Sequence, residues 1–226
     1  MMRFGNAKSG KTLFLRFVVA LTFHYLCIRY SALGKLKVNF LSTRLRYLET
    51  QNDIRIIIMT RLYLVRHGET FDNVNKILQG QTPGELTPEG IRQAEAVRDR
   101  MAGEKIDAFV SSDLKRSYDT CRIIAGPHGM DVVTTPLLRE RDWGGFTGKY
   151  IPDLKDQKWP DDVESIDALR ERAGRFLDFI RKSYPGKTVL AVGHGIVNKA
   201  VQSVYWGKPM NEIERMTNAE VRTLDL

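Results

Sequence analysis

A chain of 226 residues with 42% hydrophobic and 27% charged residues has the length and balance of a soluble globular protein with one sizeable α/β domain, alone or with an appendage. Its two cysteines, Cys27 and Cys121, exclude a disulfide framework and indicate a reducing compartment, so we expect a cytoplasmic location. The net charge of +8 belongs entirely to residues 1–58, because residues 59–226 hold 25 basic and 25 acidic side chains, which excludes an extended nucleic-acid substrate for that part.

Residues 1–58 pose a separate question, because GNAKSGKT at 5–12 matches the phosphate-binding pattern G-x-x-x-x-G-K-[ST]. Only four residues precede this stretch, which is too few for the buried strand that holds such a loop. We therefore expect no nucleotide to bind at Lys11. Three interpretations of the segment stay open: a dispensable extension from a start placed ahead of Met59, a targeting leader, or an accessory segment. We expect a domain boundary after residue 58.

The first half of residues 59–226 alternates strand and helix signals. The short apolar run RLYLV at 61–65 predicts a strand that ends at the turn His67-Gly68. Thr87 followed by proline predicts a helix start, with an apolar face formed by Ile91, Ala94, Val97 and Met101. The run 106–110 predicts a second strand, and the cluster at 111–113 predicts the cap of a helix with an apolar face formed by Leu114, Tyr118, Cys121, Ile124 and Ala125.

The second half continues this alternation. Residues 132–133 predict a third, shorter strand, which a Gly-rich loop at 138–149 follows. A helix over about 163–183 is indicated by the stripe Ile166, Leu169, Ala173, Phe176 and Ile180. The very apolar run 188–192 predicts a fourth strand that leads into a helix to about Trp206, and the alternating residues 219–226 predict an edge strand. Strands that alternate with helices predict an α/β fold, a three-layer α/β/α sandwich with a mostly parallel central sheet.

Charged side chains follow three of the predicted strands. Ligands of a parallel sheet bind at the carboxyl ends of its strands. The first strand ends in Arg66 and His67, the second leads to Arg116, and the fourth ends in His194. Two histidines and two arginines are therefore expected to converge on one edge of the sheet.

This set of side chains suits phosphoryl transfer. The planar guanidinium groups of Arg66 and Arg116 match phosphate oxygens. One neutral imidazole can attack phosphorus and form a phosphohistidine, and the other can stabilise the charge on the equatorial oxygens. Gly68 and Gly195 allow the backbone to approach the anion. Glu140, in the loop after the third strand, is the best-placed proton donor for the leaving oxygen.

Other uses of these residues are weighed against this one. A single histidine at a strand end is more often structural than catalytic, and an arginine in a first helical turn is usually solvated. Paired histidines also bind metals, but no H-x-x-x-H pair or cluster of cysteine and aspartate ligands accompanies them, so we expect no metal and no cofactor. Cys121 lies on an apolar helix face and is expected in the core rather than as a nucleophile.

Six motifs in one order resemble the histidine phosphatase superfamily, the phosphoglycerate-mutase-like proteins. They are LVRHGET at 64–70 followed by Asn73, LTPEG at 86–90, SSDLKRSYDT at 111–120, LRERDWGGFTG at 138–148, ES at 164–165 and VGHG at 192–195. The resemblance covers 59–226 and implies the α/β fold already expected. It also implies that His67 is the phosphorylated nucleophile, that Arg66, Arg116 and His194 complete the phosphate pocket, that Asn73 contacts phosphate and that Glu140 is the acid/base.

The superfamily contains both phosphatases and mutases, and the chain has features of each. LRERDWGG resembles the mutase form of the acid loop. Only fifteen residues separate Gly148 from Glu164, however, where the mutases carry a longer insertion, and the chain ends at Leu226 without their shielding tail. Because water enters an open pocket, we expect a small-molecule phosphomonoesterase of the phosphatase branch. Phosphoglycerate mutase-type transfer is the alternative, and a non-catalytic phospholigand-binding protein, which would be expected to lack His67 or Glu140, is a third.

The expected partners follow from this interpretation. We expect a small phosphorylated substrate, no nucleic acid and no membrane contact for residues 59–226. A homodimer and a targeting role for residues 1–58 stay open. The segment YIPDLKDQKW at 150–159, where the resemblance is weakest, is expected to decide which substrate is accepted.

Overall fold

The computed structural model describes residues 45–50 and 53–226, with side chains from residue 59 onward. Strands β1 (Leu45–Thr50) and β2 (Asp53–Ile58) pair antiparallel in a two-stranded sheet of their own. The stretch GNAKSGKT, the expectation for Lys11 and most of the 1–58 segment lie outside the described residues. The boundary after residue 58 remains a prediction.

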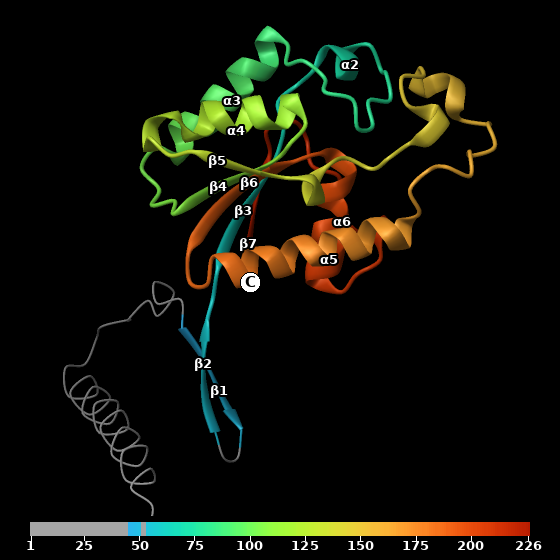
Figure 1. Ribbon diagram of the computed structural model, residues 1–226. Helices are drawn as coiled ribbons and strands as arrows, with labels where there is room; N and C mark the ends of the chain where they lie inside the picture. The colour runs from blue at the N-terminus through green and yellow to red at the C-terminus, as the bar shows by residue number, and fades with distance from the viewer. Residues whose placement is uncertain (1–44, 51–52) are drawn as a thin grey trace, which may run out of the picture. The chain divides into compact units, whose positions relative to one another are not determined.

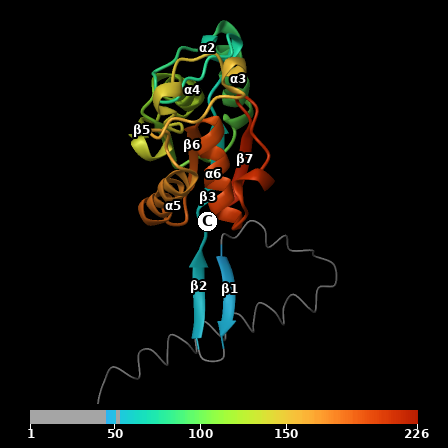
Figure 2. The same cartoon turned by 90° about the vertical axis from the view of Figure 1, so that its right-hand side faces the viewer.

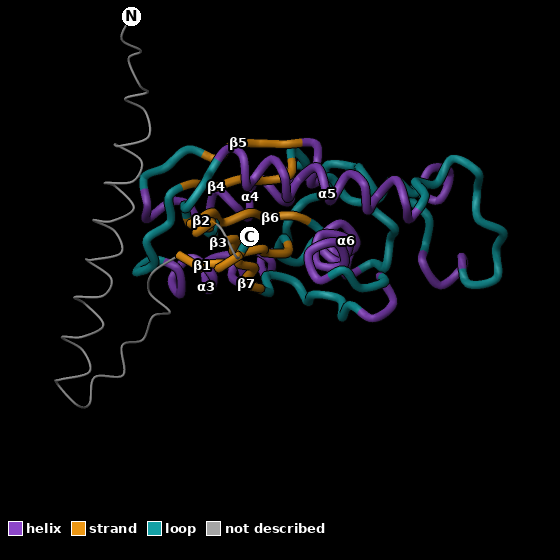
Figure 3. The backbone as a smooth tube through the Cα atoms, turned by 90° about the horizontal axis from the view of Figure 1, so that it is seen from below, coloured by secondary structure: helices purple, strands orange, loops and turns teal. Residues whose placement is uncertain are grey.

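The main sheet has five strands in the order β5-β4-β6-β3-β7. These are β3 (Arg61–Arg66), β4 (Ala108–Ser112), β5 (Val132–Thr135), β6 (Thr188–Gly193) and β7 (Val221–Asp225). All pairs are parallel except β7, which pairs antiparallel with β3 at one edge. Figure 2 shows β5 and β7 at opposite sides of the sheet, and Figure 3 shows the strands following one another in this order. The predicted mostly parallel sheet and its last edge strand are confirmed.

Helices cover both faces of this sheet, as Figure 1 shows. The helices are α2 (Phe71–Val74), α3 (Pro88–Met101), α4 (Lys115–Ala125), α5 (Ile166–Ser183) and α6 (Gly195–Trp206). Along β3, Leu62 and Leu64 pack into a core with α5 and α6, whereas Val65 packs with α3 and α4 on the other face. Because successive side chains of a strand alternate between faces, one apolar strand serves both layers. The three-layer α/β/α fold is confirmed.

Side-chain caps start two of the long helices where the sequence indicates. The Thr87 hydroxyl accepts a hydrogen bond from Gly90 N at 2.9 Å, and the Ser165 hydroxyl accepts one from Ala168 N at 3.1 Å. Proline at the first position of α3 lacks the N–H that would be unsatisfied there. Among the helices of the described residues, none is long and apolar enough to cross a membrane.

Three details differ from the sequence expectations. Ile91 and Ile166 do not lie in the core but are 42% and 40% exposed, because each lies in the first turn of its helix, ahead of the residues that contact the sheet. The second strand begins at Ala108 rather than at 106. Ser111 and Ser112 belong to that strand, so the cap position of α4 falls on Leu114, whose N–H donates to the Ser112 hydroxyl.

Candidate active site

Strand register places the two histidines side by side. Arg66 of β3 pairs with Gly193 of β6, so the next residue of each strand is a histidine at the same sheet edge. The backbone N–H of His67 donates to Gly193 O at 3.0 Å. The two rings lie with centroids 5.0 Å apart and tilted by 59°, and both residues are buried. The convergence of the strand ends therefore extends to direct contact between the imidazoles.

One hydrogen bond determines which nitrogen of His67 is free to react. Nδ1 lies 2.7 Å from Gly68 O, and since a carbonyl oxygen only accepts, Nδ1 carries the proton. Nε2 then holds the lone pair. Burial lowers the pKa of His67 well below its usual value, and the charges of Arg116, Arg66 and Arg215 lower it further, against an opposing effect of the Gly68 hydrogen bond. At neutral pH the ring is a neutral imidazole with Nε2 able to act as a nucleophile.

His194 is the N-cap residue of α6, and its ring is fully buried. Burial lowers its pKa well below the usual value, and the charges of Arg116 and Arg66 add to this effect. Both of its ring nitrogens lack a hydrogen-bond partner within the described residues. Buried polar groups are normally paired, so these nitrogens indicate a site built for a polar ligand.

Arg66 and Arg116 approach the histidines from different elements. Arg66 ends β3 and donates to Met216 O at 2.7 Å. Arg116, in the first turn of α4, donates to Gly80 O at 2.9 Å and to Thr82 O. Burial lowers the pKa of each guanidinium to about 10, which still leaves both charged at neutral pH. Within the described residues each Nε is buried without a partner, as expected for groups that hold an anion.

The two glycines of the site make room for protein groups. A Cβ at residue 68 would lie 2.3 Å from Gly90 O, so Gly68 permits close contact with the first turn of α3. A Cβ at residue 195 would lie 3.2 Å from Arg215 Nε and 3.5 Å from Arg66 Nε. Gly195 therefore brings the backbone beneath two guanidinium groups. Its contact with a bound anion remains a prediction.

Glu140 reaches the same sheet edge from the loop after β5. Its Oε1 accepts hydrogen bonds from Val197 N at 3.0 Å and from Arg141 N at 2.9 Å, and its Oε2 accepts one from Ile196 N at 3.1 Å. Two of these donors are N–H groups in the first turn of α6 that have no partner within the helix, so the start of α6 holds the carboxyl group in place. The charge of Glu140 also acts on the guanidinium groups of Arg66 and Arg116, so its carboxyl group belongs to the same site.

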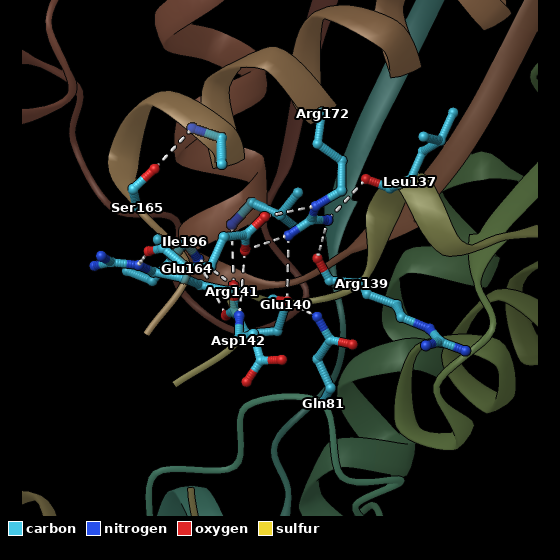
Figure 4. Close-up of polar contacts among 12 residues, drawn as sticks. Gln81, Leu137, Arg139, Glu140, Arg141, Asp142, Glu164, Ser165, Arg172 and Ile196 are labelled. Carbon is cyan, nitrogen blue, oxygen red and sulfur yellow. Dashed lines mark hydrogen bonds and ion pairs between the residues drawn. The ribbon is translucent and has the colours of Figure 1, made fainter. Parts of the chain in front are cut away.

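An arginine and a glutamate hold this acid loop in place (Figure 4). Arg172 of α5 donates to the carbonyl oxygens of Leu137 and Arg139 at 3.0 and 2.7 Å, and more weakly to that of Glu140 at 3.4 Å. The same guanidinium binds both carboxylate oxygens of Glu164, at 2.9 and 2.7 Å. Glu164 in turn accepts from Asp142 N and, through its backbone oxygen, from Arg141 Nε. We call this pair the Arg172–Glu164 clamp.

Asn73 lies at the rim, where a residue that sequence reasoning missed holds it. Its Oδ1 accepts from Asn218 Nδ2 at 3.2 Å and from Thr70 N at 3.3 Å, so its Nδ2 amide is the group that can donate to a ligand. Asn218 also donates to His67 O. Thr120, likewise missed, accepts from Gly68 N at 3.1 Å.

The direction of β7 explains why the sequence did not indicate Asn218 and its neighbours as site residues. In β7, Val221 pairs with Val65, so the amino end of this antiparallel strand lies at the edge where β3 ends. The rule that points to carboxyl ends of strands passes over such a segment. The sequence signal that could have indicated Asn218 is its place in a polar run directly before the predicted edge strand.

A mostly parallel sheet with two imidazoles, two arginines and a carboxyl group at one edge is the arrangement of an α/β enzyme. The family model of the histidine phosphatase superfamily (branch 1) matches residues 62–226, and the chain belongs to this superfamily, whose members are phosphatases and mutases. Over 172 residues the chain is 34% identical to the "Probable phosphoglycerate mutase GpmB" of Yersinia pestis. This match covers 70% of the chain and 80% of that protein.

Solved structures show the same fold. The phosphoserine phosphatase of Entamoeba histolytica in complex with 3-phosphoglyceric acid is 27% identical, with a TM-score of 0.67 over 73% of this chain and 90% of that one. A mycobacterial glucosyl-3-phosphoglycerate phosphatase in complex with VO3 is 26% identical, with a TM-score of 0.66 over 72% of this chain and 90% of that one. The relatives thus include enzymes named for both activities of the superfamily.

Proposed function

We propose that the chain is a phosphomonoesterase that hydrolyses a small phosphorylated metabolite through a phosphohistidine. The observation that carries this proposal is the state of His67, a buried neutral imidazole whose Nδ1 donates to Gly68 O, whose ring contacts that of His194 and whose Nε2 holds the lone pair. Two guanidinium groups with unused Nε donors lie in the same site. The reaction uses no metal ion.

The reaction has two steps. In the first, Nε2 of His67 forms a bond to phosphorus as the ester P–O bond breaks, and protonated Glu140 gives its proton to the leaving oxygen. Arg66, Arg116 and His194 stabilise the charge on the equatorial oxygens. In the second step water attacks phosphorus, the N–P bond breaks, and the carboxylate of Glu140 takes the proton of the water. Phosphate leaves and the neutral imidazole returns.

The short segment between residues 146 and 166 supports hydrolysis. The segment between η4 (Gly144–Phe146) and α5 is short, and its residues Tyr150, Ile151 and Trp159 are each exposed by 44–51%. Backbone bonds tie its start to the loop after α2, since Leu78 N donates to Lys149 O and Ile151 N to Lys76 O. A lid that excludes water from a phosphohistidine needs a larger cover than this segment provides.

The second candidate is phosphoglycerate mutase activity, which the name of the Yersinia relative favours. The two candidates differ only in the acceptor of the phosphoryl group, water or the sugar acid. The substrates named for the relatives, phosphoserine and glucosyl-3-phosphoglycerate, differ in the group that carries the phosphate. Membership of the superfamily therefore leaves the substrate open.

Hydrolysis of p-nitrophenyl phosphate by the full chain in EDTA tests the proposal. We expect turnover by the wild type and a loss of about 10³-fold or more in kcat/KM for His67→Ala, because the covalent route is removed. Glu140→Gln should lower kcat/KM by about 10²- to 10⁴-fold for glycerol 3-phosphate and by less for p-nitrophenyl phosphate, because p-nitrophenolate leaves without a proton.

Two results would reject the proposal. One is turnover that His67→Ala leaves intact, which would exclude the phosphohistidine. The other is interconversion of 3- and 2-phosphoglycerate, in the presence of 2,3-bisphosphoglycerate, at a rate above that of phosphate release, which would assign the mutase reaction. Acid-labile phosphate bound covalently to the wild type, and absent from His67→Ala, would be direct evidence for the phosphohistidine.

A further inference from the structure

One cation at the mouth of the site takes no part in the reaction described above. Arg215 lies in the segment between η6 (Met210–Glu212) and β7, and its side chain is exposed. Within residues 59–226, no side chain or backbone group forms a hydrogen bond or ion pair with its guanidinium. The acids on either side of it in sequence, Glu214 and Glu220, both pair with Arg222, at 4.0 and 2.6 Å.

This unpaired cation lies beside the phosphate pocket. Arg215 Nε and Arg66 Nε lie 3.2 and 3.5 Å from the same point, the place where a Cβ at Gly195 would be. The charge of Arg215 is close enough to contribute to the lowered pKa of Arg66 and of His67. Two neighbouring guanidinium groups repel each other, and an anion bound across them relieves the repulsion.

The anion at Arg215 is distinct from the reacting phosphoryl group. That group already has two buried guanidinium groups and two buried imidazoles in the pocket. Arg66 is anchored by Met216 O, and Arg116 by carbonyl oxygens of the loop at 80–83, so both are preorganised for it. Arg215 has no such anchor among residues 59–226 and its side chain is exposed, so it can bind a second group of a substrate whose phosphoryl group occupies the pocket.

We propose that Arg215 binds a carboxylate of the substrate, so that this enzyme acts on phosphorylated acids in which the carboxylate lies a few bonds from the phosphate ester. A single guanidinium offers two parallel N–H donors, which match the two oxygens of a carboxylate. The proposal rests on the phosphomonoesterase function and adds to it the class of substrate and the residue that selects it.

A matched pair of substrates tests this subsite. 3-Phosphoglycerate and glycerol 3-phosphate differ only in a carboxylate that replaces a CH2OH group. We expect the wild type to prefer 3-phosphoglycerate in phosphate release. In Arg215→Ala the ratio of the two kcat/KM values should fall by about 10- to 100-fold, the value of a hydrogen-bonded charge pair. Arg215→Glu should lower the ratio further, and Arg215→Lys should retain part of it.

The control is Arg100→Ala, which removes one exposed arginine near the end of α3 and should leave the ratio unchanged. The subsite is overturned if Arg215→Ala leaves the ratio as in the wild type. It is equally overturned if both substrates lose activity to the same extent, since Arg215 would then act on the phosphoryl group or on the fold.

A binding experiment separates failure of this inference from failure of the proposed function. Calorimetry on a His67→Ala background, with and without Arg215→Ala, gives the ratio of Kd values for 3-phosphoglycerate and glycerol 3-phosphate without any turnover. A ratio that depends on Arg215 supports the subsite even in a chain that does not hydrolyse either compound. A ratio independent of Arg215 overturns the subsite even if hydrolysis is fast.

Discussion

At the scale of single residues, the two buried imidazoles are the least ordinary groups of the protein. His67 and His194 contact each other, and both are kept neutral by burial and by the charges of Arg116 and Arg66. A neutral imidazole is required for attack on phosphorus, so the same features that depress the pKa suit His67 to the role proposed for it. This preparation has a cost in stability at acid pH.

We predict that the free energy of unfolding falls as pH drops below about 6.5, the pKa of histidine in the unfolded chain. Below that pH the unfolded state binds protons that the native site rejects, so the loss is about 1.4 kcal/mol per pH unit for each of the two histidines until the native pKa is reached. Urea unfolding at pH 7.5, 6.5 and 5.5 measures this slope.

The matched variants are His67→Gln and His194→Gln, each of which removes one titrating group from the site. Each should lower the slope between pH 6.5 and 5.5 by about half of the two-histidine contribution. An unchanged slope in both variants would show that the histidines accept protons in the native state.

At the scale of elements, the join between β3 and α3 depends on two glycines. A Cβ at Gly68 would lie 2.3 Å from Gly90 O, and a Cβ at Gly90 would lie 2.0 Å from Glu69 O. Both contacts are with backbone, which a side-chain rotation cannot relieve. The turn that carries His67 is therefore in close backbone contact with the first turn of α3.

We predict that Gly90→Ala lowers the free energy of unfolding by about 1–3 kcal/mol or more, because the strand end and the helix must separate. Since the displacement falls next to His67, kcat should fall as well. Gly103→Ala is the matched control, because a Cβ there meets nothing within 4 Å, and we expect no loss of stability. Chemical denaturation of both variants checks this, and equal stabilities would contradict the close contact.

The Arg172–Glu164 clamp is the second junction of elements, between α5 and the acid loop. Three carbonyl groups at 137–140 accept from one guanidinium, so the backbone that carries Glu140 is held from behind. Arg172 does not reach the histidine pair through any hydrogen bond, so we regard it as a positioning residue. A change at this position should act on kcat through the orientation of the acid.

We predict that Arg172→Ala lowers kcat for glycerol 3-phosphate by about 10- to 100-fold with little change in KM, because the acid group is misplaced while the phosphate pocket is kept. The loss should be smaller for p-nitrophenyl phosphate, which needs no acid, and Arg172→Lys should restore part of it. Arg175→Ala, an exposed position on the same helix, is the control. A rise in KM equal to the fall in kcat would instead place Arg172 at the substrate.

At the scale of the whole molecule, the first and last residues of the main domain lie side by side. Thr60 and Leu226 exchange backbone hydrogen bonds at 3.0 and 2.8 Å, which extend the β3–β7 pairing by one residue. Among the strands of the described residues, β1 and β2 pair only with each other. The site residues all lie in 66–218.

We predict that a chain reduced to residues 59–226 keeps kcat/KM for p-nitrophenyl phosphate within about threefold, because no backbone pairing of the main sheet is removed. We also expect no binding of ATP by the full chain at Lys11. Activity assays and calorimetry check these two points. A loss of activity on deletion would assign residues 1–58 a part in the enzyme.

The sequence alone determined the fold class, the order of the elements and the two arginines and two histidines that follow the strands, because these depend on local spacing. Period-2 and period-3.6 patterns appear in short windows, and a parallel sheet brings its carboxyl ends to one edge. Arg66, His67, Arg116 and His194 could be found in this way. Glu140 could be found as the acid candidate in the loop after the third strand, whereas the Asn73 assignment needed the order of the family motifs. The roles of all six residues remain predictions.

Only the tertiary structure decided which residues surround this set. Asn218 and His67 are 151 positions apart, and they meet because β7 runs antiparallel beside β3 and brings its amino end to the site. Arg215 comes to the phosphate pocket for the same reason, and Arg172 reaches the acid loop because α5 packs beneath it. Such contacts depend on strand order, direction and helix placement, which no local period of the sequence encodes.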